Sequence, residues 1–288
     1  CDGYTDNGYF HFNLGWEGKG NGWYMTSAIT GYDESWDFTN YQEMVIGIQP
    51  DERQTEQNNL FYAAINDEEA VVIGCNESDC YELDIASTVD IEGKPYQVTD
   101  IWLYAFHTNT SNFNPASINS IKIPGTVKSI TDSLFINCQT LSNVVMEDGP
   151  KRIGNYAFNR CTGLTQINIP ASVTSIGNNA FELCSLNEID LSSSSVTSIG
   201  NHAFACPLKT ANMPYTPYTI GDGAFSGCMF EDCYLGPATK IGMGAFASCT
   251  ALKNIYIEAE EVGEAAFTGC TGLKDVYIGA NVKQWDDR

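Results

Sequence analysis

The 288-residue sequence is poor in basic residues, with 14 lysines and arginines against 36 aspartates and glutamates, and it has only three histidines. The formal net charge of −22 argues against nucleic-acid binding, because polyanions bind to basic surfaces. It favours solubility and cationic or polar partners. No run of about 18 apolar residues is present, so we expect no membrane span. An initiator Met and a signal-type stretch are also missing, and we expect a mature or truncated piece.

The sequence does contain an internal repeat close to V-x-x-I-G-x-x-A-F-x-x-C-x-x-L-x-x-I-x-I-P. Its Phe recurs in steps of 29, 23, 23, 23, 21, 21 and 21 residues, at Phe106, Phe135, Phe158, Phe181, Phe204, Phe225, Phe246 and Phe267. A Cys stays in phase with it, at Cys138, Cys161, Cys184, Cys206, Cys228, Cys249 and Cys270. An Ile–Gly pair precedes the Phe in most copies. Such phasing is not produced by chance and indicates a repeat architecture.

A unit of this length cannot enclose its own apolar side chains, so we expect successive copies to stack as the coils of a solenoid. The L-x-x-I-x-I segment, as in residues 164–169, has the alternation of a strand and predicts a parallel sheet along one face. Pro124, Pro170 and Pro214 would end these strands. The Gly after the Ile suits a tight turn or a positive φ. The Ala–Phe pair then begins a short helical or irregular return, with Phe in the core.

The S-I-G-x-x-A-F-x-x-C core resembles the leucine-rich repeats of the BspA-like type, which occur in bacterial surface and secreted proteins. The resemblance covers about residues 98–283. It implies an α/β-type leucine-rich repeat solenoid of about eight repeats over 98–288, with its parallel β-sheet on the concave face. It also implies an extracellular or cell-surface location and a binding or adhesion role. Cys1 could be a lipid-modified first residue that anchors the protein. A simpler explanation is that Cys1 belongs to a strand at the start of residues 1–50, which are discussed below.

Residues 51–97 lack the repeat and are expected to link and cap the solenoid. Leu60–Ile65 and Ala70–Ile73 are apolar runs on either side of the polar residues Asn66–Glu69, which predicts a β-hairpin. An atypical first unit is expected because a solenoid exposes the apolar end of its first coil.

Residues 1–50 form an aromatic- and Gly-rich leader, for which we expect an N-terminal antiparallel β segment. Tyr9–Asn13 and Gly22–Met25 are predicted strands, joined by a turn over Gly15–Gly22. Glu43–Ile48 would be a third strand, which Gln49 and Pro50 end.

The order D-G-Y, Y-F-H-F-N-L-G-W-E-G, N-G-W-Y and Q-E-M-V-I-G-I-Q-P resembles the C-terminal end of the streptopain-like (C10) cysteine peptidases. That family uses a Cys–His pair, and both residues would fall upstream of Cys1. Asn13 matches the Asn of the family's N-W-G-W stretch, which is the candidate orienting amide. Trp16 matches the second Trp of that stretch, whereas Leu14 stands in place of its first Trp. The resemblance implies no activity for this chain. It leaves one alternative function, a non-catalytic C-terminal fragment of a C10 peptidase carrying a repeat appendage.

The in-phase cysteines are expected to be buried free thiols, because a straight row cannot converge four thiolates on one metal ion. Cys233 takes an Ile position of a strand, which core packing explains. For Cys75 and Cys80, a small disulfide-closed loop and two free thiols both remain open. No motif pairs a histidine with a nucleophile. We therefore expect no catalytic residue, no metal and no cofactor.

The outward strand positions of the last three repeats carry the remaining functional signal. We expect them to hold stacked tyrosines beside an acidic and amide row, because equal strand positions force equal orientation; the residues are Asp232, Tyr234, Asn254, Tyr256, Asp275 and Tyr277. The tyrosines could simply stabilise neighbouring strands. Alternatively, they bind a protein, a peptide or a glycan on the concave face. A third alternative is that the repeats only space or assemble the protein.

Overall fold

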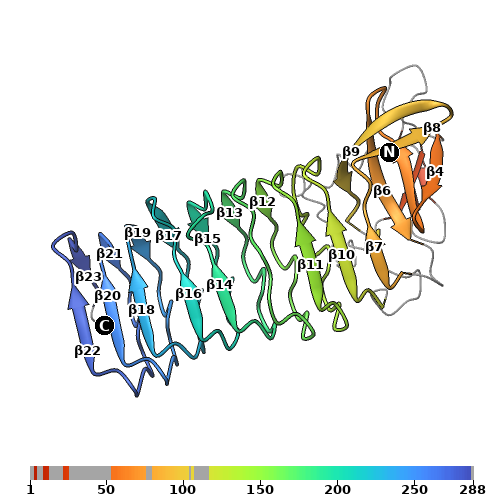
Figure 1. Ribbon diagram of the computed structural model, residues 1–288. Helices are drawn as coiled ribbons and strands as arrows, with labels where there is room; N and C mark the ends of the chain where they lie inside the picture. Colours follow the sequence, from red (N-terminus) through yellow and green to blue (C-terminus); the bar gives the residue numbers. More distant parts are fainter. Residues whose placement is uncertain are drawn as a thin grey trace.

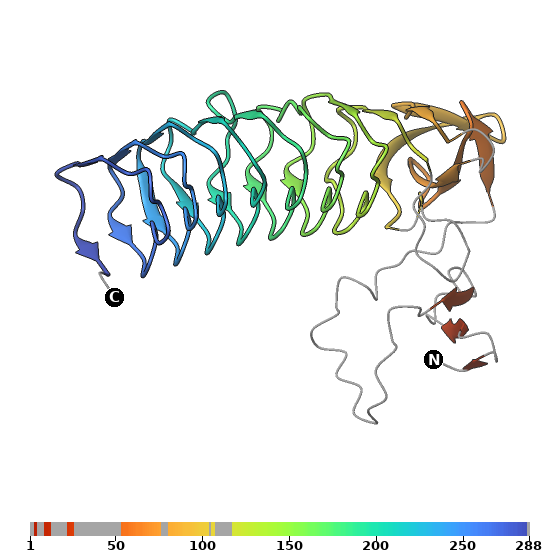
Figure 2. The same cartoon turned by 90° about the horizontal axis from the view of Figure 1, so that it is seen from below.

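The computed structural model describes residues 53–75, 80–103, 105–106 and 117–286, together with the backbone of three short strands near the N-terminus. The repeats stack one behind another as parallel-stranded coils, so the predicted solenoid is confirmed (Figure 1). Seen at right angles, the coils follow one another as successive loops (Figure 2). Their buried apolar side chains form one continuous core.

One face of the coils, here called the first face, carries the strands predicted from L-x-x-I-x-I. They pair in parallel in three groups. The groups are β7 (Glu82–Asp84), β10 (Ser120–Ile123) and β11 (Asn143–Met146); β14 (Glu188–Asp190) and β16 (Thr210–Asn212); and β18 (Asp232–Leu235), β20 (Asn254–Ile257) and β22 (Asp275–Ile278). Alternate residues are buried in β10, β11 and β18, as the period of two requires.

Residues 164–169 form no assigned strand, contrary to expectation, and this divides the first face. Leu164 and Ile169 are nevertheless buried. The amide of Ser185 in the next coil donates to the backbone oxygen of Leu164 at 3.1 Å. The segment therefore keeps its place in the stack without a complete strand ladder.

A second parallel sheet, here called the second face, lies across the core from the first and was not expected. It contains β12 (Arg152–Ile153), β13 (Ser175–Ile176), β15 (Ser198–Ile199), β17 (Tyr218–Ile220), β19 (Ala238–Ile241), β21 (Glu261–Val262) and β23 (Gln284–Trp285). The first five of these strands contain the Ile of the repeated Ile–Gly pair, whereas β21 has Val262 and β23 has Trp285 at this position. Segments of this length are too short for alternation to show in the sequence.

The returns that follow the Ile–Gly pair are turns, and the described residues contain no helix. The helical alternative is therefore wrong and the irregular one is right. The backbone explains this, because alternate amides of the return donate to the next coil, while the amides between them form single turns within their own segment. Phe158 N donates to Ala180 O and Phe181 N to Ala203 O, both at 2.8 Å.

The glycine after the repeated Ile is required by close packing of coils and not by a positive φ. A Cβ on Gly177 would lie 2.6 Å from the backbone nitrogen of Asn155 in the preceding coil. Positive φ values occur two residues further on, at Asn179 (55°) and at the exposed His202 (52°). The expectation of a positive φ at the glycine is thus corrected.

The repeated Phe side chains stack along the core, with centroids of successive rings 5.1 to 5.6 Å apart. The in-phase cysteines are free and buried, apart from a half-buried Cys270, as predicted. Cys233 is also buried, in its strand position in β18. Like residues therefore pack on like residues through the whole stack.

A five-stranded sheet precedes the coils, in the order β4–β5–β6–β9–β8. The strands are β4 (Gln54–Gln57), β5 (Leu60–Ala64), β6 (Glu69–Cys75), β8 (Thr88–Ile91) and β9 (Lys94–Ile101). β5 and β6 are antiparallel, which confirms the predicted hairpin. Only the β6–β9 pair is parallel in this sheet. Its buried residues belong to the same apolar core as the coils.

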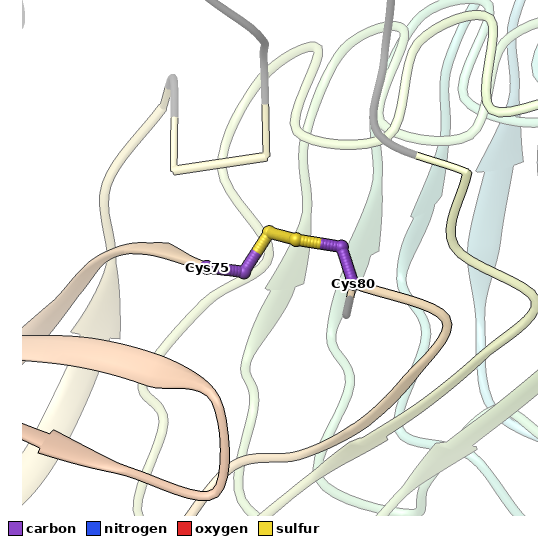
Figure 3. The surroundings of a disulfide bond; sticks show 2 residues. All are labelled: Cys75 and Cys80. Atoms are coloured by element: carbon purple, nitrogen blue, oxygen red, sulfur yellow. A yellow bond between two sulfur atoms is a disulfide. The ribbon is translucent and has the colours of Figure 1, made fainter. Parts of the chain in front are cut away.

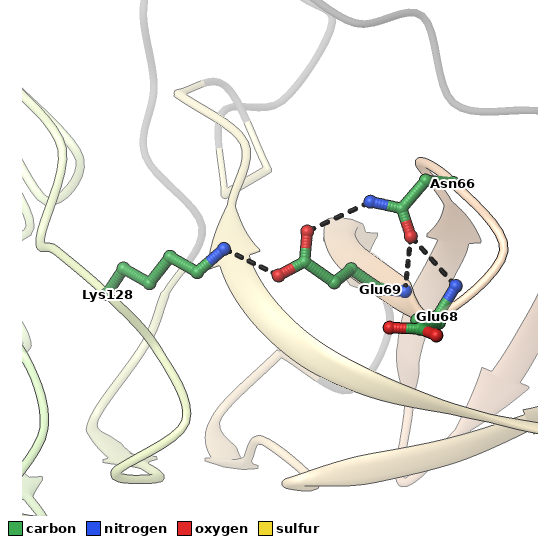
Figure 4. Close-up of polar contacts among 4 residues, drawn as sticks. All are labelled: Asn66, Glu68, Glu69 and Lys128. Carbon is green, nitrogen blue, oxygen red and sulfur yellow. Dashed lines mark hydrogen bonds and ion pairs between the residues drawn. The ribbon is translucent and has the colours of Figure 1, made fainter.

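A polar contact joins the five-stranded sheet to the coils. Asn66 accepts hydrogen bonds from the amides of Glu68 and Glu69 at 2.8 Å, and its own amide group donates to Glu69 Oε2 at 2.9 Å (Figure 4). Lys128 Nζ, from a later coil, lies 2.6 Å from Glu69 Oε1. The hydrogen bond from Lys128, followed by that from Asn66, lowers the pKa of the Glu69 carboxyl.

Cys75 and Cys80 form a disulfide, with their Cα atoms 5.9 Å apart (Figure 3). The sequence left this pairing open against two free thiols. The bond connects the end of β6 to the segment that leads into β7.

In the leader, β1 (Gly3–Tyr4), β2 (Tyr9–Phe12) and β3 (Gly22–Met25) form an antiparallel sheet with β2 in the middle. Two of these strands were predicted. The expected strand at residues 43–48 lies outside the described residues, as do Asn13 and Trp16.

Candidate functional site

Tyr234, Tyr256 and Tyr277, here called the tyrosine row, lie side by side on the first face. β18, β20 and β22 pair in parallel so that each tyrosine is directly opposite the next. Their exposed fractions are 56%, 39% and 49%. The predicted orientation is therefore confirmed, because all three side chains point away from the core.

The rings of the tyrosine row do not form a flat surface, because two of them are stacked and the third is tilted. The Tyr256 and Tyr277 centroids are 4.4 Å apart, with the planes inclined by 4°. Those of Tyr234 and Tyr256 are 6.3 Å apart at 46°. Stacked rings cover each other's faces, so the row offers ring edges and hydroxyl groups to a ligand. In the described part of the chain, the outer face of Tyr277 has no stacked ring, and Tyr234 has only its tilted contact with Tyr256.

Asp232, Asn254 and Asp275, here called the polar row, run beside the tyrosines. They too pair directly across β18, β20 and β22 and lie on the same side of the sheet. Asn254 Nδ2 donates to Asp232 Oδ1 at 2.5 Å. The charge of Asp275, and then that of Tyr256, raises the pKa of the Tyr277 hydroxyl. Like any tyrosine hydroxyl near neutral pH, it is protonated and can donate a hydrogen bond.

A salt bridge flanks the polar row. Lys253 Nζ lies 2.8 Å from Glu231 Oε2, one residue before the strands begin. Both side chains are largely exposed, so the pair contributes little to stability. It does place the Lys253 ammonium group and the Glu231 carboxylate beside the polar row.

The tyrosine row has no aromatic counterpart at the same position in the earlier strands. The equivalent outward residues are Lys122 in β10 and Val145 in β11, the latter 44% exposed. The aromatic surface is thus confined to the last three strands of the first face.

No group of three or more His, Cys, Asp or Glu residues in the described part of the chain is arranged to hold a metal ion. Burial raises the pKa of the Cys138 thiol to about 12, so the thiolate needed for nucleophilic attack is disfavoured.

A second set of aligned polar residues is structural, and sequence reasoning missed it. Each follows the Ile of a repeat by two positions and accepts the backbone amide of the next coil at 2.7 to 2.9 Å through its Oδ1 atom. The acceptors are Asp132, Asn155, Asn178, Asn201 and Asp222. Their shared position in the repeat is the signal that could have identified them.

Comparison with known proteins identifies the repeats. The model of the BspA type leucine-rich repeat region matches residues 99–231 and 175–288, with six copies. No curated protein sequence matches the chain. Within the described residues, no helix could cross a membrane.

Three solved structures are similar. A leucine-rich cell surface protein from Faecalibacterium prausnitzii has a TM-score of 0.62 and 22% identity, over 81% of this chain and 78% of its own. A leucine-rich repeat protein from Bacteroides ovatus has a TM-score of 0.46 and 21% identity, and the match covers 80% of this chain and 78% of that protein. The pneumococcal vaccine antigen PcpA has a TM-score of 0.46 and 15% identity, and the match covers 80% of this chain and 71% of that protein. The first likeness supports the fold.

Proposed function

The chain belongs to the BspA-type leucine-rich repeat family. We propose that it is a secreted or cell-surface binding module of a bacterium. Its binding surface is the outward side of β18, β20 and β22, and its ligand is a protein or an extended peptide. The Faecalibacterium protein with the same fold is described as a cell surface protein, which supports this location.

The observation that carries the proposal is the exposure of the tyrosine row beside the polar row. Tyrosine provides a large apolar contact area and a hydrogen-bonding tip at low entropic cost, and is therefore enriched at protein interfaces. The polar row adds two carboxylates, Asp232 and Asp275, whose negative charge favours cationic or amide-bearing ligands.

The ring geometry favours a peptide over a sugar. A sugar that stacks on an aromatic ring needs an open ring face. Tyr256 and Tyr277 cover the sides that face each other, which leaves a sugar only the outer face of Tyr277 and the tilted ring of Tyr234. Peptide side chains and amides can instead pack along ring edges and bond to hydroxyl groups.

The test is to replace Tyr234, Tyr256 and Tyr277 together by alanine and to compare binding with that of the unchanged chain. The probes are an immobilised panel of extracellular-matrix proteins and a glycan array. The matched control replaces Lys122 and Val145, at the same outward position in β10 and β11, by alanine. We expect the triple variant to lose at least about tenfold in affinity for a protein probe, and the control to keep it.

Both variants should keep the fold, since exposed side chains contribute little to stability. If the triple variant binds as well as the unchanged chain, the tyrosines serve strand stacking alone. If the unchanged chain binds no probe, the spacer alternative is favoured.

A further inference from the structure

Two of the exposed tyrosines are in direct contact through their rings. Tyr256 in β20 and Tyr277 in β22 stand directly opposite each other in the parallel pairing of these strands. Their ring centroids are 4.4 Å apart, and the ring planes are inclined by only 4°. Neighbouring strands of a sheet are about 4.8 Å apart, so side chains at equal positions in successive coils meet ring to ring.

Both rings of this pair can be reached from solvent. Tyr256 has a tyrosine on each side and is still 39% exposed. Its exposure therefore comes from the outward direction of the side chain and not from a missing neighbour. Tyr277 occupies the same outward position in its strand. The ring edges and hydroxyl groups of both residues consequently face solvent.

The two hydroxyl groups also lie close together. The charge of Asp275, and then that of Tyr256, raises the pKa of the Tyr277 hydroxyl, and burial and a hydrogen bond with the Tyr256 side chain add to the effect. A hydrogen bond between the two side chains requires that their rings point in the same direction. Stacked rings with neighbouring hydroxyl groups also have the ring carbons beside those groups close to one another.

No other exposed tyrosine of the described residues is stacked in this way. The ring of Tyr234 lies 6.3 Å from that of Tyr256, and its plane is inclined by 46°. Tyr81, Tyr156 and Tyr215 are exposed and have no stacked ring in the described part of the chain. The contact is therefore specific to one pair.

We propose that Tyr256 and Tyr277 are a site of oxidative cross-linking, at which a haem peroxidase acting with hydrogen peroxide joins the two side chains as dityrosine. This goes beyond the proposed function, because it is a covalent modification of the chain and needs no ligand on the first face.

The reaction balances with hydrogen peroxide as the only oxidant. Each phenol gives up one electron and its hydroxyl proton, which leaves a phenoxyl radical with spin density on the ring carbons beside the oxygen. The two radicals form one carbon–carbon bond between such carbons. The hydrogen atom on each bonded carbon then moves to oxygen and restores the phenol. The two electrons and two protons reduce one hydrogen peroxide molecule to two water molecules, and the haem of the peroxidase returns to its starting state.

Stacking favours coupling within the pair over other reactions of the radicals. A radical on Tyr256 has the ring of Tyr277 in contact, whereas coupling between two chains needs an encounter of two molecules. The net charge of −22 slows such encounters. Thiols can also reduce phenoxyl radicals, but the free cysteines of the described residues are buried or half-buried.

The cross-link can form without moving a coil. A carbon–carbon bond requires the stacked rings to tilt towards each other at one edge, and side chains that point to solvent can do this by rotation about their torsions. The product would join β20 to β22 covalently and restrict the unfolded chain, so it should raise the thermal unfolding midpoint.

The test treats the full chain, at low concentration, with hydrogen peroxide and a haem peroxidase. The monomer is separated by denaturing electrophoresis and digested with trypsin. Cleavage after Lys253, Lys274 and Lys283 places the two tyrosines in different peptides, 254–274 and 275–283, neither of which contains another tyrosine. We expect mass spectrometry of the monomer to find these peptides joined, with their summed mass less two hydrogen atoms, together with the blue fluorescence of dityrosine.

Tyr277→Phe is the decisive variant, because it keeps a ring that can stack and removes the phenol. We expect it to lose the joined peptides. The matched control is Tyr215→Phe, which removes the most exposed tyrosine of the described residues and should give the same yield as the unchanged chain. If Tyr277→Phe does not fold, Tyr256→Phe removes the other phenol of the pair and should give the same loss.

Three results would overturn the proposal. The first is a monomer in which peptide 254–274 is joined mainly to peptide 210–240, which contains Tyr234, and not to 275–283. The second is the formation of covalent dimers with no cross-link in the monomer. The third is the absence of dityrosine from the chain while the same peroxidase couples free tyrosine added to the reaction.

Discussion

The Sγ atom of Cys184 donates a hydrogen bond to the backbone oxygen of Phe158 in the preceding coil, at 3.1 Å. The same bond from a cysteine to the Phe of the coil before it recurs at Cys161, Cys228, Cys249 and Cys270. The thiols therefore fill small apolar spaces and satisfy carbonyl groups between coils. This role explains why Cys stays in phase with Phe without forming disulfides.

These thiols should resist alkylation while the chain is folded. Burial raises the pKa of Cys138 to about 12, so near pH 8 the reactive thiolate is almost absent as well as inaccessible. Peptide mapping by mass spectrometry after iodoacetamide treatment should find the buried in-phase cysteines unmodified. Cys270, which is only half-buried, should react first.

The matched control is the same treatment in denaturant, where all the in-phase cysteines should react. Cys75 and Cys80 should stay unmodified in both until a reductant is added, because they are bonded to each other. Disulfides between successive in-phase cysteines would contradict this packing.

The chain should show no thiol-dependent peptidase activity. A cysteine peptidase needs a thiolate in contact with an imidazole. The free cysteines of the described residues are buried or half-buried, and Cys75 and Cys80 form a disulfide. Incubation with casein and a reductant should give no cleavage. Cleavage that a cysteine-directed inhibitor abolishes would instead favour the peptidase alternative.

The sequence predicted the solenoid because its determinants are periodic. Phe and Cys at fixed steps require stacked coils, and alternation in β18 and β20 predicts which side chains point outward. The orientation of Tyr234, Tyr256 and Tyr277 could therefore be predicted from position alone.

What could not be predicted depends on distances between coils. Strands as short as Ser175–Ile176 have no alternation to recognise, so the second face was missed. The angle between the Tyr256 and Tyr277 rings depends on side-chain torsions, which a sequence pattern does not specify. The pairing of Cys75 with Cys80 depends on how the backbone brings their Cβ atoms together.

Gly177→Asn should destabilise the chain by close contact. A Cβ there would lie 2.6 Å from backbone atoms of Gly154 and Asn155, which cannot move without shifting a coil. We expect a loss of about 1–3 kcal/mol in the free energy of unfolding, as for other overpacked cores. Denaturant titration followed by circular dichroism would measure it.

The control is Gly227→Asn. Gly227 has a φ of 74°, and a Cβ added to it would have no atom of another residue within 4 Å. Asn tolerates this conformation, and Asn137 already adopts it (φ 62°) at the same place in an earlier coil. Equal losses in the two variants would mean that close contact with the preceding coil is not what selects glycine at 177.

Stability should fall in acid partly through Glu69. The hydrogen bonds from Lys128 and Asn66 lower the pKa of this carboxyl below its ordinary value of 4.5. A lowered pKa means that the folded state favours the ionised form. The contribution is therefore fully present above the unfolded pKa and is lost as the pH falls through the folded one.

The thermal unfolding midpoint should accordingly drop as the pH falls below the ordinary glutamate value of 4.5, and Glu69→Gln should reduce this drop. Glu68→Gln is the matched control, because the neighbouring Glu68 side chain is exposed. Asp100 acts in the opposite sense, since burial raises its pKa, and it will offset part of the effect. The difference between the two variants isolates the contact of Glu69 with Lys128 and Asn66. An identical pH profile for both variants would show that this contact does not stabilise the junction between the five-stranded sheet and the coils.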